Sequence, residues 1–128
     1  MSLSRFLLMV CTLSSLTGCT QSFEIKTERV YNGIEFRFTR KYFIVAVKYE
    51  PCLTSFEVRD GGRVGKVRWR IESIKPGVCV KLDALRYGSV PKGMREIIKG
   101  EPVLRDKMYD VDALAEPNIH GSLVNIHI

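Results

Sequence analysis

The sequence is poor in the residues from which catalytic and metal sites are usually built. Its 128 residues include only two histidines, His120 and His127, and no third ligand stands at a metal-binding spacing from them. It also contains no Gly-x-Ser-x-Gly motif, the usual setting of a hydrolase nucleophile. The sequence therefore predicts no catalytic residue, no metal and no cofactor, and we expect a protein that is not an enzyme.

The amino-terminal apolar run is too short to span a membrane. It extends from Phe6 to Leu13, whereas a helix needs ~20 residues to cross ~30 Å of hydrocarbon. The run follows a start that carries one positive charge, Arg5, and no acid. This combination is typical of an export signal peptide. Residues 1–18 are therefore predicted to be a signal that is removed.

The apolar run leads directly into Leu16-Thr17-Gly18-Cys19. Small residues let extended backbone enter a peptidase, and a thiolate is the nucleophile that forms a thioether. This stretch resembles the lipobox of bacterial lipoproteins. The resemblance implies that Cys19 receives diacylglycerol, that cleavage occurs before it, and that the new amino terminus is acylated, for example with palmitate. An ordinary secretory peptide, with Cys19 a free thiol, is the alternative.

The resemblance also implies a location. Two or three acyl chains hold a protein on a membrane much more firmly than one chain does. In lipoproteins of two-membrane bacteria, an aspartate after the cysteine favours retention in the inner membrane, and here that residue is Thr20. We therefore expect a lipid-anchored protein of the cell envelope, on the periplasmic face of the outer membrane.

The rest of the chain has the composition of one globular domain. Apolar residues make up 45% of the chain and charged residues 27%, which permits a packed core and argues against disorder. Because the signal's only charge is Arg5, its removal lowers the net charge from +6 to +5, so the basic excess belongs to the mature chain. We expect a lipidated tether over residues 19–22 and a single domain over residues 23–128.

Two of the four cysteines remain once the signal and the lipid are accounted for. Cys11 leaves with the signal and Cys19 carries lipid, which leaves Cys52 and Cys79 in an oxidising compartment. A metal site is the competing interpretation, but two cysteines without a nearby histidine form a poor ligand set. The sequence therefore predicts a Cys52–Cys79 disulfide, which the chain-entropy relation values at ~3 to 4 kcal/mol.

The mature chain alternates apolar and polar residues with a period of two, which is typical of half-buried strands. The apolar members of four alternating runs are Ile34, Phe36 and Phe38; Val67, Trp69 and Ile71; Tyr109, Val111 and Ala113; and Val124, Ile126 and Ile128. We expect Trp69 to be a core residue between two sheets. The nearly continuous apolar run from Tyr42 to Tyr49 is predicted to be a central strand covered on both faces.

Turn residues separate the predicted strands. Asn32-Gly33 and the segment 60–63 favour tight hairpins. Glycine and proline interrupt residues 83–102, which we expect to be a surface loop with one helical turn over residues 94–98. About eight short strands predict an all-β fold, namely an antiparallel β-sandwich of immunoglobulin-like or transthyretin-like kind. A small closed barrel is the alternative, because it has the same alternation.

Cations collect on one predicted strand. Lys66, Arg68 and Arg70 share its outward face, next to Arg63 in the preceding turn. The sequence allows two interpretations: a solvated face whose cations pair with acids on neighbouring strands, such as Glu57, Asp110 and Asp112, or a face that binds an acidic protein, anionic lipid or a wall polymer. In the periplasm, nucleic acid is not an expected partner.

The predicted loop is a second candidate binding surface. It carries Arg86, Tyr87 and Met94, and recognition residues are common on loops that a rigid β scaffold supports. In size, location and strand pattern the chain is similar to small proteobacterial envelope lipoproteins, including those described as type VI secretion immunity proteins. The resemblance implies an anchored domain that binds another protein without catalysis. A structural subunit of an envelope assembly is the alternative, and an envelope enzyme ranks below both.

Overall fold

The computed structural model describes residues 22–31, 33–61, 65–117 and 119–128. These residues form ten strands and no helix: β1 (Ser22–Val30), β2 (Gly33–Tyr42), β3 (Val45–Lys48), β4 (Cys52–Asp60), β5 (Val67–Ser73), β6 (Val80–Lys81), β7 (Ala84–Arg86), β8 (Met94–Ile98), β9 (Met108–Ala115) and β10 (Ile119–His127). The predicted all-β class is confirmed. The predicted signal peptide, Cys19, Asn32 and Arg63 lie outside the described residues.

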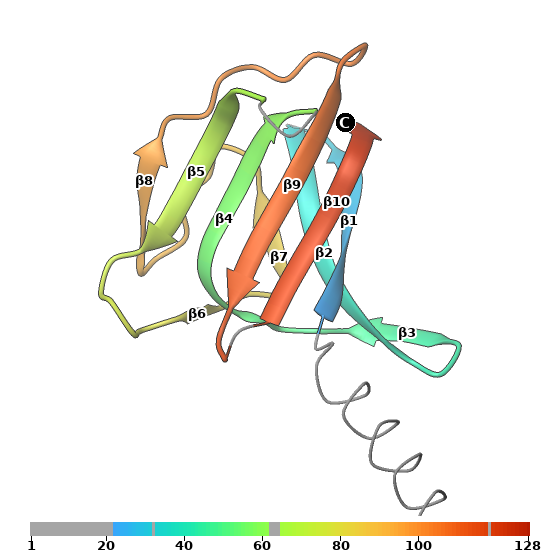
Figure 1. Ribbon diagram of the computed structural model, residues 1–128, viewed down its shortest axis with the longest axis vertical. Coiled ribbons are helices and arrows are strands. Elements are labelled where there is room, and N and C mark those ends of the chain that lie inside the picture. Colours follow the sequence, from blue (N-terminus) through green and yellow to red (C-terminus); the bar gives the residue numbers. More distant parts are fainter. Residues whose placement is uncertain (1–21, 32, 62–64, 118) are drawn as a thin grey trace, which may run out of the picture.

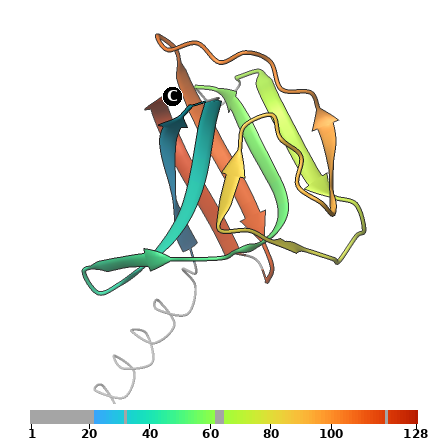
Figure 2. The ribbon, with the colours of Figure 1, turned by 180° about the vertical axis from the view of Figure 1, so that it is seen from behind.

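The strands form two layers that face each other (Figure 1). Strands β10, β9, β4, β5 and β8 make one layer, and β2, β1 and β7 make the other, seen from behind in Figure 2. The sheet runs in the order β3-β2-β1-β10-β9-β4-β5-β8 and does not close, so it is sandwich-like and the closed barrel is excluded.

One strand pair is parallel, which makes the sheet mixed. Strand β1 pairs with β10 only at Ser22 and Phe23, which lie opposite His120 and Gly121. A Cβ atom at Gly121 would overlap the Phe23 ring, so the absence of a side chain there lets the two strands approach. The remaining pairs are antiparallel, and β10 continues to His127 as a partner of β9.

Aromatic side chains fill the space between the layers. Phe36 of β2 and Phe56 of β4 have ring centroids 5.0 Å apart, and Trp69 of β5 lies 5.9 Å from Phe56. All three are fully buried. The inward faces predicted for Ile34 to Phe38, Trp69 to Ile71 and Tyr109 to Ala113 are confirmed, because a strand with one solvated face needs that alternation. Of the other predicted inward residues, Ile128 is buried, Val67 and Ile126 are half-buried, and the side chain of Val124 lies outside the described part of the chain. Trp69 is a core residue, as predicted.

The predicted central strand over Tyr42 to Tyr49 is wrong. A turn at Phe43 and Ile44 divides the run, and the second half forms β3, whose four residues are all exposed. Strand β3 pairs only with the end of β2 and projects from the body (Figures 1 and 2). The apolar composition of the run suggested burial on both faces, but no other strand of the described chain covers this hairpin.

The predicted surface loop over residues 83–102 and its helical turn over 94–98 are also wrong. Two short strands lie in this segment: β7, which pairs with β2, and β8, which pairs with β5. The register sets Met94 opposite Ser73. Met94 is buried, so its side chain joins the core in place of a solvated helical turn.

The predicted disulfide between Cys52 and Cys79 is present. It joins the start of β4 to the segment before β6, with the two Cα atoms 5.0 Å apart. Strand β6 pairs with β4 next to the bridge, where Lys81 lies opposite Cys52. In the part of the chain that the structure describes, no helix is long and apolar enough to cross a membrane.

Candidate functional site

The basic residues of β5 are paired with acids. The Arg68 guanidinium donates two hydrogen bonds to the Asp60 carboxylate, at 2.7 Å and 2.8 Å, and a third to Glu101 at 2.6 Å. Lys66 Nζ lies 2.9 Å from the same Glu101 carboxylate. Arg70 pairs with Glu72 at 2.6 Å, on its own strand. All three cations therefore have anionic partners. This arrangement agrees with the interpretation of a solvated face whose cations pair with acids.

These contacts fix the charges of the network. Hydrogen bonding from Arg68 lowers the pKa of the Asp60 carboxyl, and hydrogen bonds from Lys66 and Arg68 lower the pKa of Glu101. Hydrogen bonding to Asp60 and then to Glu101 raises the pKa of the Arg68 guanidinium. At neutral pH, two cations thus face two carboxylates. This part of β5 carries no excess positive charge with which to attract an acidic partner.

Tyr87 belongs to the same network and is not a free recognition residue. Its hydroxyl donates a hydrogen bond to the backbone oxygen of Glu101 at 2.6 Å, and its ring lies 5.1 Å from that of Trp69. Burial is the main cause that raises the pKa of Tyr87 to about 12. Of the three predicted loop residues, Met94 is buried, Tyr87 is half-buried, and only Arg86 is exposed.

Of the acids that pair with these cations, the sequence named Glu57, which lies 3.7 Å from Arg70, but it gave no indication of Glu101. Glu101 is 33 positions from Arg68 and follows β8, and Glu96 accepts a 2.9 Å hydrogen bond from the Trp69 indole across 27 positions. Only Asp60, on the far side of the β4–β5 turn, is close in sequence. Its pairing with Arg68 could have been inferred from the hairpin, since strand residues on either side of a turn lie opposite each other.

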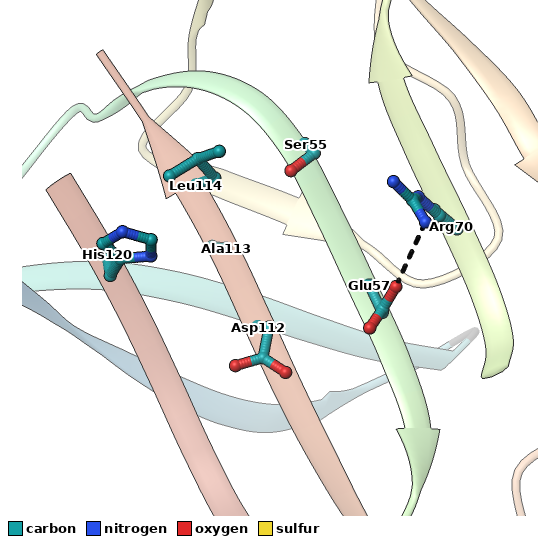
Figure 3. Close-up of a pocket in the computed structure, with 7 residues that line it drawn as sticks. All are labelled: Ser55, Glu57, Arg70, Asp112, Ala113, Leu114 and His120. Atoms are coloured by element: carbon teal, nitrogen blue, oxygen red, sulfur yellow. Dashed lines mark ion pairs between the residues drawn. The ribbon is translucent and has the colours of Figure 1, made fainter. Parts of the chain in front are cut away.

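The outer face of the β10–β9–β4–β5 layer is the second candidate site (Figure 3). The register sets Leu114 of β9 between Ser55 of β4 and His120 of β10. Two residues before Leu114 on β9, Asp112 lies opposite Glu57 of β4. Arg70 of β5 lies on the other side of Glu57, and its guanidinium is 3.7 Å from the Glu57 carboxylate. These side chains, together with Ala113, line a shallow hollow of about 120 Å³. That volume is below the ~300 Å³ at which pockets for small organic ligands begin.

Ser55, Asp112 and His120 are residue types found in hydrolases, but here they do not touch. Ser55 and His120 lie on opposite sides of Leu114, two strand spacings or roughly 10 Å apart at the backbone. No hydrogen bond joins any two of the three within the described residues. A nucleophile must lie within hydrogen-bond reach of its base, so this geometry lacks that contact.

Among the described side chains, no group of three or more histidine, cysteine, aspartate or glutamate residues is placed to hold a metal ion. Comparison of the chain with protein-family models, curated proteins and solved structures finds no match.

Proposed function

We propose that this chain is a lipid-anchored envelope protein whose β domain binds another protein and carries out no chemistry of its own. The observation that carries the proposal is the Leu16-Thr17-Gly18-Cys19 pattern directly behind an apolar signal-like run. Strand β1 begins at Ser22, three residues after Cys19. The Cys52–Cys79 disulfide supports the same compartment, because disulfides persist in oxidising environments such as the periplasm.

The outer face of the β10–β9–β4–β5 layer is the surface we assign to the partner. Arg70, Glu57 and Asp112 place both signs of charge beside the partly buried Leu114. A broad face with interspersed charges suits a folded protein, because charge complementarity over such a face selects the partner and its orientation. The small volume of its hollow argues against a small-molecule ligand.

Inhibition is the role we favour for this binding, in the manner of an immunity protein that occludes the site of an incoming toxin. A structural role in an envelope assembly is the second candidate. The short tether favours it, because the three residue-to-residue steps from Cys19 to Ser22 reach at most about 11 Å and hold the domain close to the bilayer. The two roles differ in what the partner does once it is bound.

Lipidation is tested by growing cells with labelled palmitate. The wild-type protein is expected to take up the label and to lose its first eighteen residues, and Cys19→Ser is expected to do neither. Cys11→Ser is the matched control, because it removes a cysteine of the signal and should leave labelling unchanged. An unlabelled, full-length wild-type product would refute the proposal.

The binding face is tested by crosslinking in intact cells. A photoreactive residue at Ser55 or Asp112 should capture one defined protein, whereas the same residue at the exposed Lys26 of β1, in the other layer, should not. Charge reversal by Asp112→Lys should abolish capture from Ser55. If the purified partner has an activity and this protein suppresses it, the inhibitor role holds. Equal capture from Lys26 would contradict the choice of face.

A further inference from the structure

The tip of the β2–β3 hairpin exposes four consecutive apolar residues. Tyr42 and Val45 form its last pair and are 57% and 59% exposed, while Phe43 and Ile44 make the turn, where Ile44 is 94% exposed and Phe43 entirely so. Figures 1 and 2 both show the hairpin extending beyond the two layers. An apolar tip of this kind on a folded domain marks a contact with something outside it.

The backbone at the tip is itself unfavourable for its residue. Phe43 has φ +58°, in the left-handed region where a two-residue hairpin turn normally carries glycine or asparagine. A bulky aromatic residue there costs conformational energy that glycine would not. The turn thus retains a large apolar side chain at the position where the backbone favours it least, which points to a use for that side chain.

The stem of the hairpin is basic. Residues 40–48 include Arg40, Lys41 and Lys48 and no acid. The Arg40 guanidinium lies over the Tyr42 ring, 5.9 Å from its centroid, and Lys41 pairs with Glu24 at 3.4 Å in an exposed contact that contributes little. This arrangement matches the interface of an anionic bilayer. The apolar tip would contact the acyl chains, and the cationic stem would lie at the level of the phosphate groups.

The hairpin also lies at the tethered end of the molecule. Glu24, two residues from the start of β1, pairs with Thr39, while β2 runs on to Tyr42. The tip therefore projects roughly 13 Å along the backbone beyond that pair. The tether from Cys19 to Ser22 is no longer than about 11 Å. A lipid on Cys19 would bring the bilayer within reach of the tip.

We propose that the tip of the β2–β3 hairpin, Tyr42 to Val45, inserts into the interface of the anionic bilayer to which Cys19 is attached. The choice of bilayer rests on the proposed lipidation. The hairpin is a second attachment point that fixes the orientation of the domain and keeps the outer face of the β10–β9–β4–β5 layer available to its partner. The alternative is that a second copy of the chain or another protein covers the apolar tip.

The test imposes the tether artificially, so that it does not depend on natural lipidation. Residues 20–128, which contain every described strand and the whole described core, carry an amino-terminal polyhistidine tag in this test. The tag holds this protein on vesicles of phosphatidylcholine, phosphatidylglycerol and a nickel-chelating lipid, with or without bromine on the phosphatidylcholine chains. Phe43→Trp reports on the tip. Tyr31→Trp, at a fully exposed residue directly after β1, is the matched control, and buried Trp69 supplies a constant background.

Insertion by ~5–10 Å should shift the Phe43→Trp emission to the blue and lower its intensity about twofold with brominated lipid. Tyr31→Trp should change in neither respect. Lys41→Gln combined with Lys48→Gln should weaken the quenching, and so should the omission of phosphatidylglycerol.

An unquenched Phe43→Trp on tethered protein would overturn the hairpin proposal. So would a blue shift that appears without vesicles and grows with protein concentration, because a second copy would then cover the tip. Neither result bears on palmitate labelling, and a failure of labelling would leave the quenching result standing. The two proposals can therefore fail separately.

Discussion

Replacing Cys52 and Cys79 together by alanine tests the main covalent constraint on this fold. The bridge closes a loop with a sequence separation of 27, which contains β4, β5 and the hairpin between them. The chain-entropy relation gives about 3.5 kcal/mol at 25 °C for a loop of this length. The Cα separation of 5.0 Å lies within the usual range for disulfides, so we deduct nothing from that value.

The expected loss is about 3.5 kcal/mol in the free energy of unfolding, measured by guanidinium chloride titration of the mature chain. For a domain of this size it corresponds to a fall in melting temperature of about 15 °C. The wild-type protein in the presence of a phosphine reductant is the matched control. It should unfold at the same denaturant concentration as Cys52→Ala/Cys79→Ala.

Two results would refute this reasoning. A loss below about 1 kcal/mol would mean that the bridge does not constrain the unfolded chain as the relation requires. A wild-type protein whose stability is unaffected by reductant would mean that the two cysteines are unpaired in the native state. The second result would also remove the support that the disulfide lends to a periplasmic location.

Three further predictions concern the core and the β5 network. Phe56→Ala removes a fully buried ring between the layers and should cost about 3–5 kcal/mol of unfolding free energy in denaturant titration. Arg68 lowers the pKa of Asp60, and Lys66 and Arg68 lower that of Glu101. The ion pairs of these two carboxylates therefore stabilise the fold above about pH 4, the pKa of a carboxyl in the unfolded chain. This stabilisation is lost as the pH falls through their lower pKa values in the folded protein. Arg68→Met should therefore lose less stability than wild type between pH 7 and pH 3, and an identical pH profile would contradict this. Tyr87→Phe removes the 2.6 Å hydrogen bond to the Glu101 backbone and should cost about 1 kcal/mol. Since the Tyr87 pKa is raised to about 12, wild type should lose stability above about pH 10, where the unfolded phenol ionises, and ultraviolet titration of Tyr87→Phe should lack this late ionisation.

Local alternation was enough to predict most of the strands. In the middle of the strands around Phe36, Trp69 and Val111, apolar buried residues alternate with more exposed polar ones, because the strand period of two sends alternate side chains to one face. Turn chemistry predicted that the strands on either side of Asn32-Gly33 and of residues 60–63 would pair, and the antiparallel pairs β1–β2 and β4–β5 confirm this. Asn32 and residues 62–64 of the turns lie outside the described residues. These features involve only neighbours along the chain.

Prediction failed where a strand's position in the sheet decided its environment. The run from Tyr42 to Tyr49 has the composition of a buried strand, yet β3 lies at the end of the strand order and beyond the body of the fold. Residues 94–98 become a strand only because β5 lies beside them in the folded chain. Neither fact can be predicted from a short segment of the sequence.

The candidate site, too, was predicted only in part. The sequence placed Lys66, Arg68 and Arg70 on one face of a strand, but it could not show that Glu101 would meet Arg68. Nor could it show that Tyr87 would be drawn in against Trp69 and the Glu101 backbone. These contacts turned a predicted basic binding surface into a network of paired charges.

The sequence alone determined the β class and the alternation of buried and exposed strand residues, and it indicated the Cys52–Cys79 pair, since each inference depends on residue type and spacing. Tertiary structure alone decided which charges are paired, which apolar run is left exposed and which strands lie at the edges. Those outcomes depend on which distant segments meet, and long-range pairing is set by the packing of the whole chain and not by any short stretch of it.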